Sequence, residues 1–288
     1  MGCNRIEDPE MPGRVEGKVA FVTGAARGQG RSHAIKLAEE GADIIAIDVC
    51  KNVDNVQLDL ATPGDLLETK ARVEALGRRI IAEEVDVRDY DAMKAVVDRG
   101  VAELGRLDII LANAGIGNGG QTVETLEEDV WQTMMDVNLT GVWKTVKAGI
   151  PHMIAGGRGG SIVLTSSVAG LKAYPQMSQY VSAKHGVVGL MRSCATELGQ
   201  HMIRVDSVHP THVNSPMVMN DETFRMFRPD LENPGPDDIA PICQMFHTMP
   251  RPWVEVEDIT NAVMFFASDD SRYVTGVAMP IDLGSCLK

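Results

Sequence analysis

This sequence has few cysteines and lacks a long apolar segment. Its five cysteines are odd in number and scattered, without a Cys-x-x-Cys pair, so neither a disulfide framework nor a zinc ribbon is expected and a reducing, cytoplasmic setting is favoured. No apolar run approaches the roughly 20 residues that a membrane-spanning helix needs. Basic residues are the minority, with 27 Lys and Arg against 40 Asp and Glu, so the net charge of −13 argues against nucleic acid and against an anionic membrane as main partners.

Glycine and short apolar segments, by contrast, are plentiful. The 288 residues include 28 glycines and are 44% hydrophobic, which suffices for the core and the tight turns of one α/β domain. Apolar runs of strand length alternate with segments of helical period, which is the pattern of a parallel sheet with helices on both faces. The expected strands are 18–24, 42–48, 79–85, 107–113, a segment ending at 164, 203–208 and 273–281. The expected helices run from the first glycine turn to about 40, over 65–76, 89–104 and 126–153, onward from 176, and over 257–267.

A glycine-rich turn joins the first expected strand to the first expected helix. Gly24, Gly28 and Gly30 give the spacing G-x-x-x-G-x-G, with Arg27 and Gln29 between them. Glycine lets the backbone approach a diphosphate closely, and a helix N-terminus offers free N–H groups and the positive end of the helix dipole. The turn therefore indicates a dinucleotide site, although a purely structural turn would use the same residues.

The second expected strand ends in a carboxylate, Asp48, 18 residues after Gly30. An acid at this place can accept hydrogen bonds from both hydroxyls of an adenosine ribose and repels a 2′-phosphate, so it selects NAD over NADP. Arg27 favours the opposite choice, because a basic residue in the glycine turn can pair with that phosphate. We give Asp48 more weight, since it should lie at the ribose itself; its alternative role is a cap at the strand end.

The clearest indication of chemistry is Ser167 followed by Tyr180-x-x-x-Lys184. Tyr180 and Lys184 are four residues apart in an expected helix and so share one face, while Ser167 lies on the strand end or loop that faces this helix. A free phenol has a pKa of about 10, roughly three units too high for a base at neutral pH, and a nearby cation favours the phenolate. The three side chains suit proton transfer coupled to hydride transfer, although Tyr-x-x-x-Lys also occurs by chance on surface helices.

Residues of suitable chemistry gather at the carboxyl ends of the expected strands. Gly24, Asp48, Asp86, Asn113 and Ser167 all fall at such ends. Parallel sheets bind their ligands at this edge. The co-location across five strands is hard to reconcile with chance and predicts one site along one edge of the sheet.

Three segments and one residue depart from the alternation. Residues 1–16 are polar, so we expect a flexible extension before a single domain at 17–288. Residues 50–63 are irregular and form an insertion, and residues 216–252, rich in Met, Pro and Phe with weak periodicity, suggest a mobile substrate lid. Asn138 is a poor mid-helix residue, which either disturbs the helix or is an ordinary buried amide.

His209 and His212 are three residues apart and invite a metal interpretation. No Glu or third ligand stands at helical spacing, and Pro210 prevents a helix at this point. No metal site is therefore expected.

These motifs, in this order and spacing, resemble those of the short-chain dehydrogenase/reductases over about residues 17–282. The resemblance implies a Rossmann-type, doubly wound sheet of about seven strands and a nicotinamide cofactor. It also implies a catalytic tetrad in which Tyr180 is the general acid/base and Ser167 orients the substrate oxygen. Lys184 would bind the nicotinamide ribose and lower the pKa of the phenol, and Asn138 would hold a water of the proton relay. The cofactor-binding residues expected from motif and resemblance together are Gly24, Arg27, Gly28, Gln29, Gly30, Asp48, Asp86, Val87, Asn113, Ala114, Gly115, Tyr180, Lys184, Pro210, Thr211, Val213 and Ser215.

The glycine turn, the insertion and the sequence His209-Pro210-Thr211 resemble a mycofactocin-associated subgroup that includes carveol dehydrogenases. That resemblance implies an NAD that stays bound and an external redox carrier that recycles it. We expect residues 50–61 to close over the adenine end and slow NAD exchange. The apolar lid suits a small apolar alcohol or ketone, such as a cyclic terpene alcohol, and the expected assembly is a cytoplasmic homotetramer.

Two other functions remain open at this point. One is an NADPH-dependent 3-oxoacyl-thioester reductase, against which Asp48 and the absence of a basic docking patch argue. The other is a non-catalytic NAD-binding regulatory protein. A pure binder has no need for Ser167 and Tyr180 together, so the enzyme interpretation is preferred.

Overall fold

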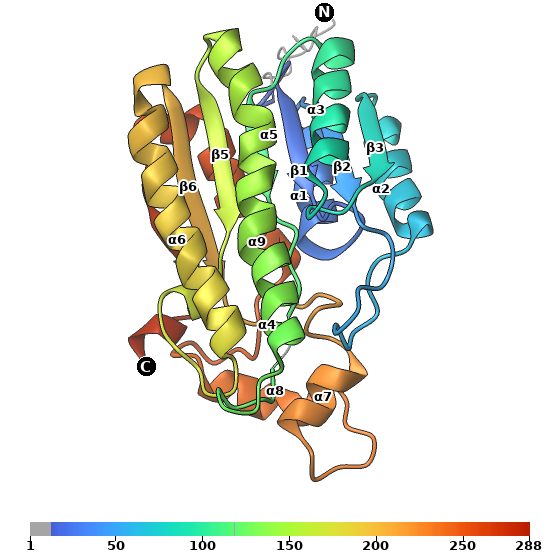
Figure 1. Cartoon of the computed structure of the whole chain (residues 1–288), viewed down its shortest axis with the longest axis vertical. Coiled ribbons are helices and arrows are strands. Elements are labelled where there is room, and N and C mark those ends of the chain that lie inside the picture. Colours follow the sequence, from blue (N-terminus) through green and yellow to red (C-terminus); the bar gives the residue numbers. More distant parts are fainter. Residues whose placement is uncertain (1–12, 118) are drawn as a thin grey trace, which may run out of the picture.

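The computed structural model describes residues 13–117 and 119–288, and its centre is a seven-stranded parallel sheet in the order β3-β2-β1-β4-β5-β6-β7 (Figure 1). The strand order runs outward from β1 in both directions, which confirms the expected doubly wound α/β fold. Because all pairings are parallel, the strands end at one common edge, here called the carboxyl edge. The strands are β1 Val19–Thr23, β2 Asp43–Asp48, β3 Ile80–Glu84, β4 Ile109–Ala112, β5 Gly160–Thr165, β6 Ile203–Pro210 and β7 Ala278–Ile281.

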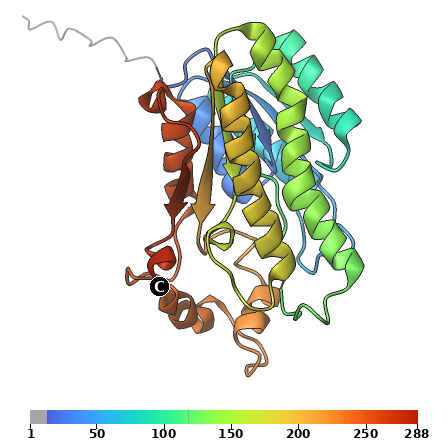
Figure 2. The same ribbon diagram turned by 60° about the vertical axis from the view of Figure 1, so that its left-hand side comes forward.

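Helices cover both faces of the sheet (Figures 1 and 2). One face carries α1 Gly28–Glu39, α2 Pro63–Ala75 and α9 Val256–Ala267; the other carries α3 Tyr90–Leu104, α4 Glu128–Met135, α5 Gly141–Gly156 and α6 Ser178–Leu198. Successive strand residues point to opposite faces, so β1 places Phe21 in one core and Ala20 and Val22 in the other. Within the described ranges, no helix is both long and apolar enough to cross a membrane.

The predicted helix 126–153 is interrupted at Asn138. A π-helical turn, Asp136–Thr140, separates α4 from α5, so the expectation that Asn138 disturbs the helix is confirmed. Its side chain is fully buried: Oδ1 accepts the N–H of Ile116 and Nδ2 donates to the carbonyl of Ile116, both at 2.8 Å. The wider turn thus fixes the amide against the loop that follows β4.

The prediction of a strand over 273–281 is wrong in its first half. β7 begins only at Ala278. Gly276 adopts a left-handed φ of +76°, which no strand residue takes, and Tyr273 is 83% exposed. The apolar run before Ala278 therefore forms a turn beside β6.

The segment 216–252, predicted to have weak periodicity, contains two helices. They are α7 Asp221–Phe227, capped by the Asn220 side chain, and α8 Pro236–Met245. Phe224 of α7 and Ile239 and Cys243 of α8 form a small core of their own. Both helices lie beyond the carboxyl edge, at the bottom of Figures 1 and 2, close to the C-terminus. This small core is shared by the two helices, which the sequence periodicity of a short helix does not reveal.

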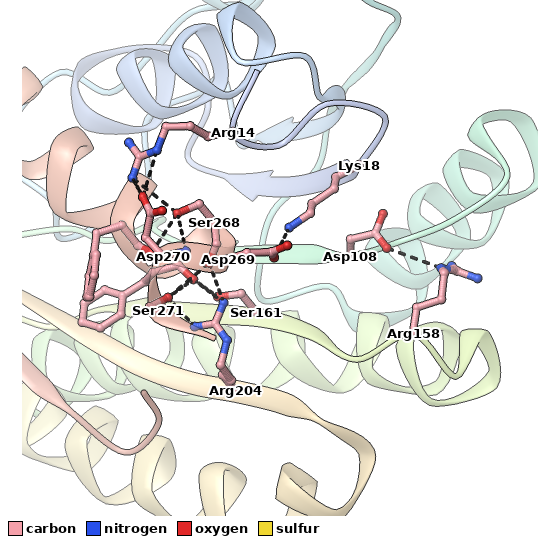
Figure 3. A network of polar contacts seen from close by, with 12 residues as sticks. Arg14, Lys18, Asp108, Arg158, Ser161, Arg204, Ser268, Asp269, Asp270 and Ser271 are labelled. Carbon is pink, nitrogen blue, oxygen red and sulfur yellow. Dashed lines mark hydrogen bonds and ion pairs between the residues drawn. The ribbon is translucent and has the colours of Figure 1, made fainter. Parts of the chain in front are cut away.

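The opposite, amino edge of the sheet is held by a network of polar side chains (Figure 3). Arg14 pairs with Asp270, and Arg204 of β6 donates to the hydroxyl of Ser271 at 2.7 Å. The turn 268–271, which follows α9, therefore joins the beginning of the described chain to β6. This network lies away from the carboxyl edge and has a structural role.

The expected flexible extension, residues 1–16, is in part a misassignment. Residues 1–12 lie outside the described residues. Residues 13–16 form a turn in which Val15 is fully buried and the backbone N–H of Val15 donates to the carbonyl of Glu40 at 3.1 Å. The sequence did contain a sign of this burial, because Val15 is an apolar side chain within a largely polar segment.

Asp206 of β6 carries a fully buried carboxylate with only one hydrogen-bonded oxygen. Oδ1 accepts the N–H of Val277 at 3.0 Å, while Oδ2 has no hydrogen-bond partner among the described residues and lies 3.9 Å from the guanidinium of Arg204. Burial raises the pKa of Asp206 from its ordinary value of 3.8 to about 6, and the Val277 hydrogen bond and Arg204 oppose this only partly. The charged form is therefore disfavoured in the folded protein.

We expect Asp206→Asn to stabilise the protein above pH 6 but not at pH 4. Because the folded-state pKa lies above the unfolded value, the folded protein binds more protons between the two values, and wild-type stability is lost as pH rises through this window. The shift corresponds to about 1–3 kcal/mol of unfolding free energy above pH 6. Urea denaturation of both proteins at pH 4 and pH 7.5 measures the difference. An equal gain at the two pH values would contradict the ionisation argument.

Candidate active site

The glycine turn after β1 requires glycine for its backbone angles and, at Gly24 and Gly30, for lack of space. Gly24 and Gly28 adopt left-handed φ angles of +67° and +55°. A Cβ at Gly30 would lie 2.0 Å from the carbonyl oxygen of Gly24, so only glycine fits. The N-cap residue of α1, Arg27, makes no side-chain cap, which leaves the N-terminus of this helix available to an anion.

A cleft opens in front of this turn at the carboxyl edge. It is lined by many of the expected cofactor-binding residues: Gly24, Arg27, Gly28, Gln29, Gly30, Asp48, Asp86, Val87, Asn113, Ala114, Gly115 and Ser215. Sequence reasoning did not single out the remaining lining residues, which are Val49, Val53, Leu58, Leu60, Ala61, Val85, Ile116, Val137, Pro216 and Met217. They adjoin an expected site residue, belong to the insertion, which was expected to close over the adenine end, or belong to the segment 216–252, which was expected to form a lid.

The chemistry of the cleft fits a dinucleotide. Glycine backbone and a helix N-terminus stand on one side, as a diphosphate requires. Oε1 of Gln29 is buried and has no hydrogen-bond partner among the described residues, which leaves a polar group for a ligand. The carboxylates of Asp48 and Asp86 line the cleft together with apolar side chains, an environment suited to a ribose and an adenine ring. The Asp86 carboxylate is itself paired with the guanidinium of Arg88 at 2.6 Å.

Asp48 performs the structural role that the sequence left open and also lines the cleft. Its Oδ2 accepts the N–H of Ala26 at 3.0 Å, and its Oδ1 accepts the N–H of Cys50 at 3.2 Å. Burial raises the pKa of the Asp48 carboxyl, and these two backbone hydrogen bonds oppose the shift. The carboxylate thus holds the glycine turn from the end of β2.

The insertion 50–63 folds against the glycine turn. The guanidinium of Arg27 donates to the carbonyl oxygen of Asp59, which ties the insertion to the N-terminus of α1. Val53 and Leu58 of the insertion line the cleft and are nearly buried. Arg27, which the sequence alone suggested as a partner for a 2′-phosphate, therefore has a partner within the chain.

The loop after β4 connects the cleft to the expected tetrad. Asn113 Nδ2 donates to the carbonyl of Thr23 at 3.0 Å, which joins the ends of β4 and β1. A Cβ at Gly115 would lie 3.2 Å from Oδ1 of Asn138 and 3.6 Å from Nζ of Lys184. Gly115 thus lies both in the cleft wall and beside two tetrad side chains.

Ser167, Tyr180 and Lys184 lie together at the carboxyl edge, as their spacing predicted. The Ser167 hydroxyl is hydrogen-bonded to the Tyr180 phenol. Nζ of Lys184 lies 5.6 Å from the centroid of the Tyr180 ring and donates to the carbonyl of Thr165 at 2.9 Å. The lysine side chain is buried, with 4% exposed, so its charge is held close to the phenol in a poorly solvated place.

Burial dominates the acid–base properties of this group. It raises the pKa of the Tyr180 phenol above its ordinary value, and the hydrogen bond with Ser167 offsets only part of the shift. Burial also lowers the pKa of Lys184 to about 8. In the chain alone Tyr180 is therefore a neutral phenol at neutral pH. We expected Lys184 to lower the pKa of this phenol, but in the absence of a cofactor the effect of burial is larger and the pKa is raised.

The turn after β6 brings some of its expected residues to the site. Ser215 lines the cleft, and the carbonyl of Pro210 lies 3.5 Å from Oγ of Ser167. Thr211 and Val213 do not line the cleft: the Thr211 hydroxyl bonds to His247 at 2.7 Å, and Val213 is buried. A further cofactor contact of these two residues stays a prediction.

The two histidines of this turn have separate environments. His209 is fully buried and bonds to Ser207 and Ser167, each at 2.8 Å. The ring of His212 packs against Phe227 and Phe246, with centroids 5.7 Å apart in each case. In the part of the chain that the structure describes, no group of three His, Cys, Asp or Glu side chains could hold a metal ion.

Aromatic residues link the two lid helices to the tetrad. Phe246, at the end of α8, contacts the rings of both Tyr174 and His212. Tyr174 belongs to the loop between Ser167 and Tyr180 and is close enough to perturb the phenol of Tyr180 electrostatically. Tyr174, Phe246 and His212 therefore form a cluster of rings at the end of α8.

Comparison with known proteins gives concordant matches. The family model described as short chain dehydrogenase matches residues 18–225. A (−)-trans-carveol dehydrogenase of Rhodococcus erythropolis is 55% identical over 275 residues, which are 96% of this chain and 99% of the relative. The crystal structure of a carveol dehydrogenase from Mycobacterium avium in complex with NAD is 65% identical, has a TM-score of 0.95, and is matched over 96% of this chain and 100% of its own. A short chain dehydrogenase from Mycobacterium paratuberculosis bound to NAD is 47% identical, has a TM-score of 0.87, and shows the same coverage.

Proposed function

The chain belongs to the short-chain dehydrogenase family, and from this premise we propose that it is an NAD-dependent oxidoreductase that interconverts a secondary alcohol and its ketone. The observation that carries the proposal is that Ser167, Tyr180 and Lys184 lie together, while a Cβ at Gly115, in the wall of the cleft, would lie 3.6 Å from Nζ of Lys184. A cyclic terpene alcohol is the substrate class that we favour, because the lid is apolar and because two of the relatives are carveol dehydrogenases.

Each tetrad residue has a distinct task in this reaction. NAD, when bound, supplies the ring that accepts or returns the hydride and, in its oxidised form, a positive charge. The Tyr180 phenol donates its proton to the ketone oxygen during reduction, and the Tyr180 phenolate removes the hydroxyl proton during oxidation. The Ser167 hydroxyl hydrogen-bonds the substrate oxygen as its charge changes. Lys184, whose Nζ donates to the carbonyl of Thr165, is in this proposal a cation that favours the deprotonated phenol.

In this proposal the bound cofactor also contributes to the acid–base chemistry of Tyr180. Burial raises the pKa of Tyr180 in the chain alone, so oxidation of an alcohol needs an additional positive charge beside the phenol. Oxidised nicotinamide carries such a charge. Asn138, locked to both polar groups of Ile116, keeps the π-helical turn in place, and we propose that it positions a water of the proton relay.

We also propose that the cofactor is held tightly and is recycled by an external redox carrier. The support is the contact between Arg27 and the carbonyl of Asp59, which closes the insertion 50–63 over one side of the cleft. A cytoplasmic homotetramer is proposed on the family resemblance alone. Ready loss of NAD during gel filtration would contradict the proposal that the protein holds its cofactor tightly.

The proposal predicts activity on cyclic secondary alcohols with NAD and at least tenfold less with NADP, because the carboxylate of Asp48 repels a 2′-phosphate. Spectrophotometric assays with a panel of such alcohols and both cofactors measure the preference, with Asp48→Asn as the comparison variant. Asp48→Asn should reduce the ratio of the activity with NAD to the activity with NADP.

The competing functions give different results in the same assays. Reduction of 3-oxoacyl thioesters with NADPH, but no alcohol oxidation, would favour a thioester reductase. Binding of NADH, followed by its fluorescence, without turnover of any alcohol would favour a regulatory protein.

A further inference from the structure

His209, at the end of β6, bonds to the backbone of a tetrad residue. Nδ1 lies 2.8 Å from the carbonyl oxygen of Ser167, and Nε2 lies 2.8 Å from Oγ of Ser207. The ring is fully buried. It thus connects the interior of β6 with the segment that carries Ser167.

The partners of the ring fix its tautomer. A carbonyl oxygen only accepts, so Nδ1 of His209 carries the proton and donates it to Ser167. Burial lowers the pKa of His209 to about 4, which keeps the ring neutral at physiological pH. Nε2 then accepts, and the hydroxyl of Ser207 donates to it.

The backbone alone does not hold Ser167 to β6. The ladder between β5 and β6 reaches Ser166, whose N–H donates to the carbonyl of Val208 at 2.9 Å. Pro210 has no N–H and so cannot continue the ladder. Beyond this point the carbonyl of Ser167 accepts from the N–H of Gly170, within its own turn, and from His209 of β6 at 2.8 Å. The Ser167 hydroxyl accepts the N–H of Ala169 at 3.1 Å and makes a longer contact, 3.5 Å, with the carbonyl of Pro210 in β6.

We propose that His209, its tautomer fixed by Ser207, is a positioning residue that holds Ser167 so that its hydroxyl faces the phenol of Tyr180. The inference rests on the proposed function. Two carbonyls at the end of β5 are then held in a similar way, that of Thr165 by Nζ of Lys184 and that of Ser167 by His209. His209 does not line the cleft, and its hydrogen bond to the tetrad is the one to the carbonyl of Ser167.

A double-mutant cycle with Ser167→Ala tests this role. We expect His209→Phe, which keeps a ring but loses the donor, to lower kcat about tenfold and to leave NADH binding, measured by its fluorescence, within twofold of wild type. In the Ser167→Ala background the same substitution should lower kcat by less than twofold further. His209→Asn places an N–H donor at the same distance from the backbone as Nδ1 and should recover most of the activity.

If His209→Phe lowers kcat by the same factor in the wild-type and the Ser167→Ala backgrounds, the inference is overturned. The effect of a residue that merely supports the fold does not depend on the Ser167 hydroxyl. If His209→Phe fails to fold, Ser207→Ala replaces it, with an expected loss of about threefold that disappears in the Ser167→Ala background. His201→Phe, on an exposed histidine, is the matched control and should not change kcat. A wild-type protein that oxidises no alcohol with NAD would refute the proposed function itself, whereas an active wild type with additive losses refutes only the role of His209.

Discussion

Tyr180→Phe is expected to reduce turnover by on the order of 10³-fold while leaving the affinity for NADH nearly unchanged. The substitution removes only the phenolic oxygen, which is the atom bonded to Ser167 and the proton donor of the proposed reaction. The ring itself, which lies 5.6 Å from the ammonium of Lys184, keeps its place. Steady-state rates with a cyclic alcohol and titration of NADH fluorescence measure the two quantities separately.

A matched comparison for this variant is Tyr174→Phe. Tyr174 lies nearby and is also partly buried, but its ring contacts Phe246 and its hydroxyl bonds to Ser285 at the C-terminus. Removal of that hydroxyl should cost less than tenfold in turnover. Full activity of Tyr180→Phe would refute the acid/base assignment, and equal losses in the two variants would point to a role in packing.

Gly30→Ala is expected to have the second largest effect, a loss of NAD from the protein. The new Cβ would lie 2.0 Å from the carbonyl oxygen of Gly24 and 2.7 Å from Nδ2 of Asn113. The first of these atoms is backbone, so the glycine turn must move, at an expected cost of about 1–3 kcal/mol in stability. A displaced turn no longer presents its N–H groups to a diphosphate, and we expect at least a tenfold weaker affinity for NAD.

The measurement is the amount of NAD that stays with each protein through gel filtration, together with thermal unfolding. Gly189→Ala on α6 is the control, because a Cβ there meets open space. It should raise stability by up to about 1 kcal/mol, since alanine favours a helix more than glycine, and retain NAD as the wild type does. Retention of NAD by Gly30→Ala at the wild-type level would contradict the role assigned to the turn.

The lid shows where prediction from the sequence reached its limit. Met, Phe and Pro at irregular spacing led us to expect a mobile lid without regular structure, but α7 and α8 are short helices whose buried residues face each other. A helix of two or three turns shows too few periodic positions to be recognised, and a core shared by two such helices exists only after they meet. The cluster of rings formed by Tyr174, Phe246 and His212 was beyond prediction for the same reason.

By itself, the sequence determined the winding of the sheet, the glycine turn, and the meeting of Ser167 with Tyr180 and Lys184. These features follow from local rules: strands in one parallel sheet share a carboxyl edge, and residues four apart on a helix share a face. Only the tertiary structure decided that Arg27 holds the insertion at Asp59, and that His209 holds Ser167 across the end of the ladder. Both contacts join segments more than 30 residues apart, where no local periodicity constrains the approach and the packing of the whole domain sets the distance.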